Sequence, residues 1–181
     1  MRILIAVTHL LGAGHLTRAA ALARAFAAAG HEVMLISGGT PSPLVRLDTV
    51  QLVQLPPVHI VGTAFSTLLR PDGEPADADW LARRRARSIE AFASFAPDAV
   101  LTELFPFGRR ALAEEFQALV EAAQARVPRP LILASVRDIL VATTRTCARG
   151  CLPSLHDLHH QHRCLSHVLQ CAREHNYDFS S

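Results

Sequence analysis

The amino-acid sequence predicts an α/β fold, in which a parallel β-sheet carries helices on both faces. Five short apolar runs alternate with longer segments, several of which place apolar side chains at helical spacing. Prolines and glycines separate these segments, as is typical where strands and helices end. Residues 143–181 show neither pattern, so we expect an irregular tail there.

The first strand, helix and second strand follow one another closely. Residues 2–7, RILIAV, are apolar and β-branched and too few for a helix, which favours a buried strand. Apolar side chains at helical spacing then predict a helix over residues 16–29, with Gly30 placed as its C-cap glycine. Residues 31–37, HEVMLIS, are predicted to be the second strand.

The remaining elements continue the alternation. Residues 50–55 alternate apolar and polar side chains and stop at two prolines, which predicts a third strand. A helix is predicted over residues 79–95, with Leu81, Ile89, Phe92 and Phe95 on its inner face. Strands are then predicted at 99–104 and 131–136, on either side of a helix marked by Leu112, Phe116, Leu119, Val120 and Ala123.

Length and composition narrow the possible functions. A chain of 181 residues suits one domain, or one domain and a fragment of another. The net charge of +2 is too small to indicate a nucleic-acid partner. Apolar runs are too short for a membrane span, and the amino terminus does not resemble a signal peptide. We therefore expect a cytoplasmic protein.

The loop after the first strand contains glycines but does not fit a nucleotide fingerprint. Gly12 and Gly14 match the first two positions of the dinucleotide motif, whereas Thr17 stands at the third. The second strand ends in Ser37, Gly38 and Gly39, so no carboxylate follows to bind a ribose. The loop also lacks the lysine of a P-loop. These departures argue against a nicotinamide or flavin, and we expect no cofactor.

The same loop could still serve a ligand. Gly12 and Gly14 let the backbone approach a ligand, and the free N–H groups at the start of the next helix favour an anionic or hydroxyl-rich group. His15 stands at this point and can accept a proton near neutral pH. Alternatively, His15 caps the helix or bonds a backbone carbonyl, and the spacing alone leaves both interpretations open. In a parallel sheet ligands bind at the carboxyl ends of strands, which here means loops 8–15, 37–44, 103–109 and 136–140.

Three separated motifs resemble one family. The stretch HLLGAGHLTRAAALARAFAAAGHEV resembles the amino-terminal loop and helix of GT-B glycosyltransferases, notably the MurG-like group. TELFPFGRR at residues 102–110 and SVRDIL at 135–140 are similar to motifs of predicted bacterial glycosyltransferases of that group. The resemblance covers residues 1–142, and the combination is more specific than any single motif.

The resemblance implies a fold and a reaction. Residues 1–142 would be the Rossmann-like, acceptor-side domain of a GT-B enzyme that transfers a sugar from a nucleotide-sugar donor to an acceptor hydroxyl. His15 would be the catalytic base, and Gly12, Ala13, Gly14 and Arg18 would line the substrate. The acceptor would be a sugar or a lipid-linked molecule, and no metal would be required. Since the donor domain is missing from 181 residues, we expect this chain alone to be weakly active or inactive.

Two alternatives stay open. Related nucleotide-sugar hydrolases carry a similar G-x-G-H-x-x-R pattern, which Gly12, Gly14, His15 and Arg18 fit equally well. In those enzymes the histidine activates water rather than a sugar hydroxyl. The other alternative is an inactive fragment that at most binds an acceptor.

Charged residues near the predicted strand ends have two possible roles. Glu103 could bind acceptor hydroxyls or orient His15, or it could instead pair with Arg109 or Arg110. Arg137 and Asp138 are predicted to form an ion pair, and RRRAR at residues 83–87 is predicted to be a solvated helix face.

The tail differs in composition from the rest of the chain. All four cysteines and six of the ten histidines lie beyond residue 146. Their spacing includes no second tight cysteine pair, so it does not fit a zinc site well, and we expect no metal. Because the family-like sequence stops near Ala142, we interpret residues 143–181 as a possible out-of-frame or foreign extension.

Overall fold

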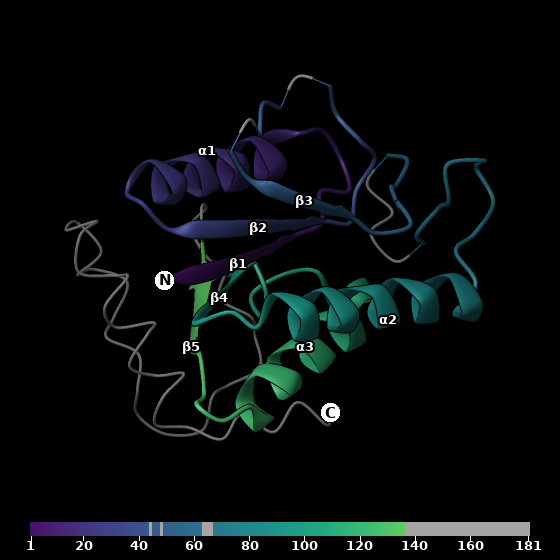
Figure 1. Cartoon of the computed structure of the whole chain (residues 1–181). Coiled ribbons are helices and arrows are strands. Elements are labelled where there is room, and N and C mark those ends of the chain that lie inside the picture. The colour runs from purple at the N-terminus through teal and green to yellow at the C-terminus, as the bar shows by residue number, and fades with distance from the viewer. Residues whose placement is uncertain (44, 48, 63–66, 137–181) are drawn as a thin grey trace, which may run out of the picture. The chain divides into compact units, whose positions relative to one another are not determined.

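The computed structural model describes residues 1–43, 45–47, 49–62 and 67–136. Its centre is a sheet of five parallel strands in the order β3-β2-β1-β4-β5 (Figure 1). The strands are β1 (Arg2–Val7), β2 (Glu32–Ser37), β3 (Gln51–Gln54), β4 (Ala99–Glu103) and β5 (Leu131–Ser135). The predicted parallel sheet is therefore confirmed.

Helices cover both faces of this sheet, as predicted. Helix α1 (Gly14–Ala28) packs on β1 and β2 from one side. Helices α2 (Ala78–Phe95) and α3 (Ala113–Ala125) pack against each other on the opposite side, and the 3-10 turn η1 (Arg110–Leu112) leads into α3 (Figure 1).

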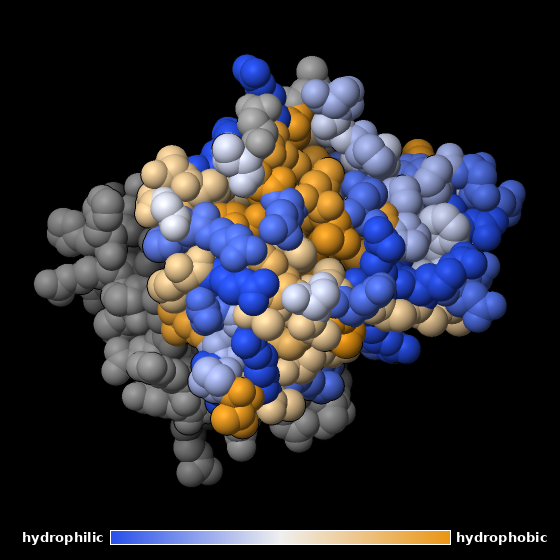
Figure 2. Space-filling view, in the orientation of Figure 1, coloured by the Kyte–Doolittle hydropathy of each residue, from blue (hydrophilic) through white to orange (hydrophobic). Residues whose placement is uncertain are grey.

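Alternation along the strands explains why the sheet is buried on both faces. In β1, Ile3, Ile5 and Val7 join the core beneath α1, whereas Leu4 and Ala6 join the core beneath α2 and α3. The edge strand β3 is less buried than the central strands, and Figure 2 shows apolar surface over it. Leu52 of β3 is 50% exposed and Gln54 is partly buried, so burial in this strand does not follow the alternation of apolar and polar side chains that predicted it.

The ends of α1 are set by special backbone positions. The helix begins at Gly14, two residues before the predicted start, with Ala13 as an N-cap that makes no side-chain hydrogen bond. Gly12 has a φ of +69°, which brings the chain round from β1. At the other end Gly30 has a φ of +84°, as expected for a glycine just beyond a helix.

The predicted inner face of α2 is found for most of its residues. Phe92 and Phe95 are buried, Leu81 is partly buried and packs against the same core, and Ile89 is partly buried. Arg84 also lies in the buried stripe and has no exposed surface. The prediction that residues 83–87 form a solvated face is therefore wrong at Arg84, although its four neighbours in that run are exposed.

The strand order has a reversal next to β1. The chain passes from β1 to β2 and β3 on one side, and returns through α2 to place β4 and β5 on the other side of β1. Ligand sites in such sheets lie beyond the carboxyl ends of the two strands at this reversal, here β1 and β4. His15 lies in the first turn of the helix that follows β1, and Glu103 is the last residue of β4, so both stand at this edge of the sheet.

Within the described residues, no helix combines the length and apolar character needed to cross a membrane.

Candidate active site at the carboxyl ends of the central strands

His15 and Glu103 lie in direct contact. His15 Nδ1 is 3.1 Å from Glu103 Oε1, although the two residues are 88 positions apart in the chain. His15 stands in the first turn of α1, and Glu103 is the last residue of β4. The Glu103 side chain is 1% exposed and the His15 side chain 19%, so the carboxylate is enclosed while the imidazole still reaches solvent. Of the interpretations that the sequence left open, the contact matches a carboxylate that orients His15.

Arg18 joins this pair from the next turn of α1. Its Nε atom lies 3.8 Å from Glu103 Oε1 and donates to Ser135 Oγ at 3.2 Å. Its Nη2 atom donates to the backbone carbonyl of Val136 at 3.4 Å. Arg18 thus links the start of α1 to the carboxyl ends of β4 and β5, and its side chain is 39% exposed. It is not simply a surface residue of the helix.

The space around Gly12 is open. No protein atom lies within 4 Å of a Cβ built at this position, so within the protein the glycine is favoured by its φ of +69°, and its role in letting a ligand approach stays a prediction. Gly12 and Gly14 are exposed, and Ala13 is partly buried. The N-cap residue of α1, Ala13, makes no side-chain hydrogen bond to the first N–H groups of the helix, which lie beside His15.

Gly38 and Gly39 make the close contacts that the sequence did not reveal. A Cβ at Gly38 would collide with Thr8 and Arg84, and one at Gly39 would collide with the ring and carbonyl of His9. His9 is buried, and burial is the main cause that lowers its pKa from 6.5. A hydrogen bond with the Thr40 backbone opposes this effect, and the charges of Arg109 and His15 add to it.

Arg109 lies in the loop after β4, near Glu103 but not paired with it. Of the two roles considered for Glu103, pairing with Arg109 or Arg110 is not found among the described residues, where its ion-pair partners are His15 and Arg18. Arg109 has a φ of +65°, and its Nε and Nη2 atoms are buried without a hydrogen-bond partner in the described part of the chain.

Beneath the site, Arg84 connects three strand ends to the helices. Its Nε and Nη2 atoms donate to the Glu115 carboxylate at 2.8 and 3.0 Å. Its Nη1 atom donates to the carbonyls of Gly38, at 2.7 Å, and of Pro56, while Nη2 reaches Thr8 Oγ1 at 3.4 Å. Burial raises the pKa of the Glu115 carboxyl, and Arg84 opposes that rise. The loops after β1, β2 and β3 are therefore held by one buried guanidinium.

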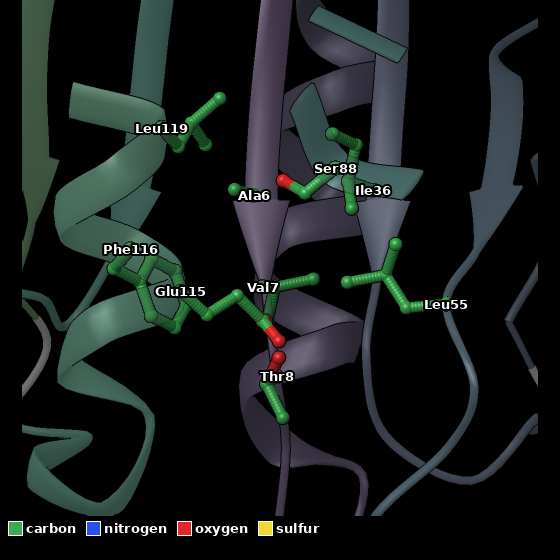
Figure 3. Close-up of a pocket in the computed structure, with 9 residues that line it drawn as sticks. All are labelled: Ala6, Val7, Thr8, Ile36, Leu55, Ser88, Glu115, Phe116 and Leu119. Atoms are coloured by element: carbon green, nitrogen blue, oxygen red, sulfur yellow. The ribbon is translucent and has the colours of Figure 1, made fainter. Parts of the chain in front are cut away.

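A small cavity lies beside this buried pair, between the sheet and the α2–α3 layer. Figure 3 shows its lining residues, among which Glu115, Thr8 and Ser88 carry the polar atoms. The cavity has room for about one water molecule, so it is too small for a substrate. The candidate site is therefore the surface around His15, not this cavity.

Within the described ranges, no group of three or more histidine, cysteine, aspartate or glutamate side chains could hold a metal ion. The four cysteines, Arg137, Asp138, the boundary at residue 142 and the tail 143–181 all lie outside the described residues.

A comparison with models of known protein families gives no match, and a comparison with curated protein sequences gives none either. A comparison with solved structures finds glycosyltransferases. The Streptomyces sp. SF2575 glycosyltransferase SsfS6 is similar over 74% of this chain and 38% of its own, at 17% identity and a TM-score of 0.45.

A UGT transferase from Siraitia grosvenorii, in complex with UDP, is similar over 74% of this chain and 27% of its own, at 13% identity and a TM-score of 0.42. The glycosyltransferase VinC, in complex with dTDP, is similar over 74% of this chain and 49% of its own, at 14% identity and a TM-score of 0.34. This chain thus spans less than half the length of each of these proteins.

Proposed function

We propose that this chain is the acceptor-side half of a GT-B glycosyltransferase, which transfers a sugar from a nucleotide-sugar to an acceptor hydroxyl. The observation that carries the proposal is the contact between His15 Nδ1 and Glu103 Oε1 at the strand-order reversal of the sheet. A histidine held by an enclosed carboxylate, and still open to solvent, is equipped to deprotonate a hydroxyl group.

The Glu103 carboxylate defines how His15 would act. An ionised carboxylate can only accept a hydrogen bond, so it favours the neutral tautomer with the proton on Nδ1. This leaves the Nε2 lone pair to accept the proton of the acceptor hydroxyl. Glu103 then stabilises the imidazolium cation that results, and its position inside the sheet keeps the ring oriented.

The proposed transfer step follows from these roles. The acceptor O–H bond breaks and its proton moves to His15 Nε2. The acceptor oxygen forms a bond to the anomeric carbon of the donor sugar, and the bond from that carbon to the diphosphate oxygen breaks. The nucleoside diphosphate leaves with the electron pair. The first N–H groups of α1, which receive no side-chain cap from Ala13, are placed to bind acceptor hydroxyls next to His15.

Nucleotide release tests the proposal. The chain is incubated with UDP-sugars and dTDP-sugars, since UDP and dTDP are the nucleotides named with two of the similar glycosyltransferases. Release of nucleoside diphosphate that depends on an added acceptor, and that is lost in His15→Gln, supports a transferase. Arg24→Gln is the matched control, because Arg24 lies on the same helix but bonds only to the carbonyl of Arg46 among the described contacts.

Two other outcomes would contradict the proposal. Release without an acceptor would show that His15 activates water, as in a nucleotide-sugar hydrolase. Acceptor-dependent release that His15→Gln leaves unchanged would remove the histidine from the reaction. No release of nucleoside diphosphate from any donor is expected if the donor half must be supplied. The assay is then repeated on a chain extended by the downstream coding sequence.

A further inference from the structure

The guanidinium of Arg109 presents two unpaired donors beside the candidate site. Nε and Nη2 are both buried and have no hydrogen-bond partner among the residues that the structure describes. Leaving such donors unsatisfied is costly, since hydrogen bonds to charged groups are among the strongest in proteins. Native structures keep such groups where a ligand or an ordered water satisfies them.

A second arginine in the same chain shows what this pair of atoms binds. Arg84 uses its own Nε and Nη2 atoms to hold the two oxygens of Glu115, at 2.8 and 3.0 Å. These two N–H groups point the same way and match the spacing of two oxygens on one carboxylate or phosphate. In Arg109 the equivalent pair has no carboxylate from the described residues.

The loop after β4 places Arg109 next to the catalytic pair. The Gly108 N–H donates to the Leu104 carbonyl at 2.7 Å, which folds the loop back on itself directly after Glu103. A Cβ at Gly108 would collide with the Leu104 side chain, so this fold-back needs a glycine. Arg109 follows in the left-handed conformation, and as a residue it remains partly exposed. Part of the Arg109 residue is therefore open to solvent, whereas its Nε and Nη2 atoms become accessible to a ligand only when the side chain or its neighbours move.

Glu103 contributes a second unpaired atom. Its Oε1 atom contacts His15 and Arg18, but Oε2 is buried and has no partner in the described part of the chain. A carboxylate oxygen accepts hydrogen bonds from O–H or N–H donors, so the hydroxyl group of a ligand can satisfy it. Donors on Arg109 and an acceptor on Glu103 together select a ligand that carries an oxyanion near a hydroxyl.

We propose that Arg109 is a binding residue for the carboxylate or phosphate of a small hydroxylated ligand, such as a sugar acid or a sugar phosphate. Nε and Nη2 of Arg109 hold two oxygens of the oxyanion, and Glu103 Oε2 accepts a hydrogen bond from a neighbouring hydroxyl. If the proposed transferase function holds, this ligand is the acceptor, and its hydroxyl lies beside His15. Binding itself requires no donor and no turnover.

Equilibrium binding to the whole chain tests this site separately from the proposed function. D-Glucuronate, D-glucose 6-phosphate and D-glucose are titrated by calorimetry at about 0.15 M salt, where nonspecific charge attraction is screened. Arg110→Gln is the matched control, because Arg110 directly follows Arg109, at the start of η1, and is exposed. Arg109→Lys keeps the charge but cannot offer two parallel donors.

The proposal expects saturable binding of at least one of the two anionic sugars by the unmodified chain. Arg109→Gln and Arg109→Lys should weaken it by about tenfold to a hundredfold, whereas Arg110→Gln should leave it unchanged. Which anionic sugar binds more tightly distinguishes a carboxylate ligand from a phosphate ligand.

Three results would overturn the proposal: no saturable binding of either anion, equal loss in Arg110→Gln, or glucose binding as tight as that of the anions. Nucleotide release that is absent from the extended chain, or that His15→Gln leaves unchanged, would with anion binding intact count against the proposed function alone.

Discussion

The buried pair of Arg84 and Glu115 allows a quantitative test of how the candidate site is supported. We consider Glu115→Gln, which keeps the shape of the side chain but removes its charge. Arg84 has no exposed surface, and its only carboxylate among the described contacts is Glu115. The substitution leaves a cation inside the protein without its counter-charge, and breaking such a pair costs about 3–5 kcal/mol.

The neighbouring ion pair between the same two helices is a matched control. Arg85 follows Arg84 in α2, and Glu114 precedes Glu115 in α3. Arg85 Nη1 lies 3.3 Å from Glu114 Oε2. Their side chains are 45% and 89% exposed, so Glu114→Gln should cost no more than about 1 kcal/mol. The two variants thus remove the same chemical group from a similar distance, and they differ in burial.

Urea unfolding of the two variants and the unmodified chain measures the difference. We expect Glu115→Gln to lower the free energy of unfolding by several times the loss in Glu114→Gln, with an unchanged dependence on urea. A double variant, Arg84→Met with Glu115→Leu, should recover most of the loss, because it removes both buried charges. A loss in Glu115→Gln as small as that of Glu114→Gln would refute this account of the pair.

Three further predictions concern the glycines and His9. Gly39→Ala should lower the free energy of unfolding by about 1–3 kcal/mol, because the new methyl group meets the His9 ring and carbonyl; unchanged urea unfolding would contradict this. Gly12→Ala should lower the free energy of unfolding by about 1–2 kcal/mol, because the surrounding space is open and only the φ of +69° opposes the methyl group. A larger loss would contradict the open space around this residue. The lowered pKa of His9 means that the unfolded chain binds this proton more tightly, so stability should fall as pH drops below about 6.5. Unfolding measured from about pH 7 to pH 5 should show a shallower fall in His9→Asn than in a control His31→Asn, and equal slopes would contradict the assignment.

The sequence predicted the architecture well because its local patterns agree with which residues the fold buries. Each predicted strand was found within two residues of its predicted ends, since apolar runs of this length are buried on both faces of a parallel sheet. The start of α1 was predicted two residues late, because Gly14 and His15 carry no apolar signal although both are helical. Its C-terminal glycine was correct because a left-handed residue after a helix is a local requirement.

Contacts between distant segments could not be predicted in the same way. The burial of Arg84 depends on Glu115, Gly38 and Pro56, which lie on three other segments, and nothing in RRRAR distinguishes it from its neighbours. The paired glycines after β2 were a usable signal, because two adjacent glycines at a strand end often mark a close approach of the backbone.

In the candidate site, too, the positions of single residues were predictable and the contacts between distant residues were not. His15 and Glu103 were both named from the sequence because each follows or ends a strand at the ligand edge of the sheet. Their direct contact was one of two interpretations, and only the fold distinguishes it from pairing with Arg109 or Arg110. The bond of Arg18 to β5 depends on the strand order, which no local pattern specifies.

The most direct test of the central claim is the protonation state of the two ring nitrogens of His15. ¹⁵N NMR of the imidazole, at a pH where the ring is neutral, reports which nitrogen carries the proton. We predict the proton on Nδ1 in the unmodified chain, and a shift toward Nε2 in Glu103→Met, which removes the carboxylate that holds it. If the proton lies on Nε2 in the unmodified chain, or if Glu103→Met leaves the tautomer unchanged, Glu103 does not orient His15 as a base.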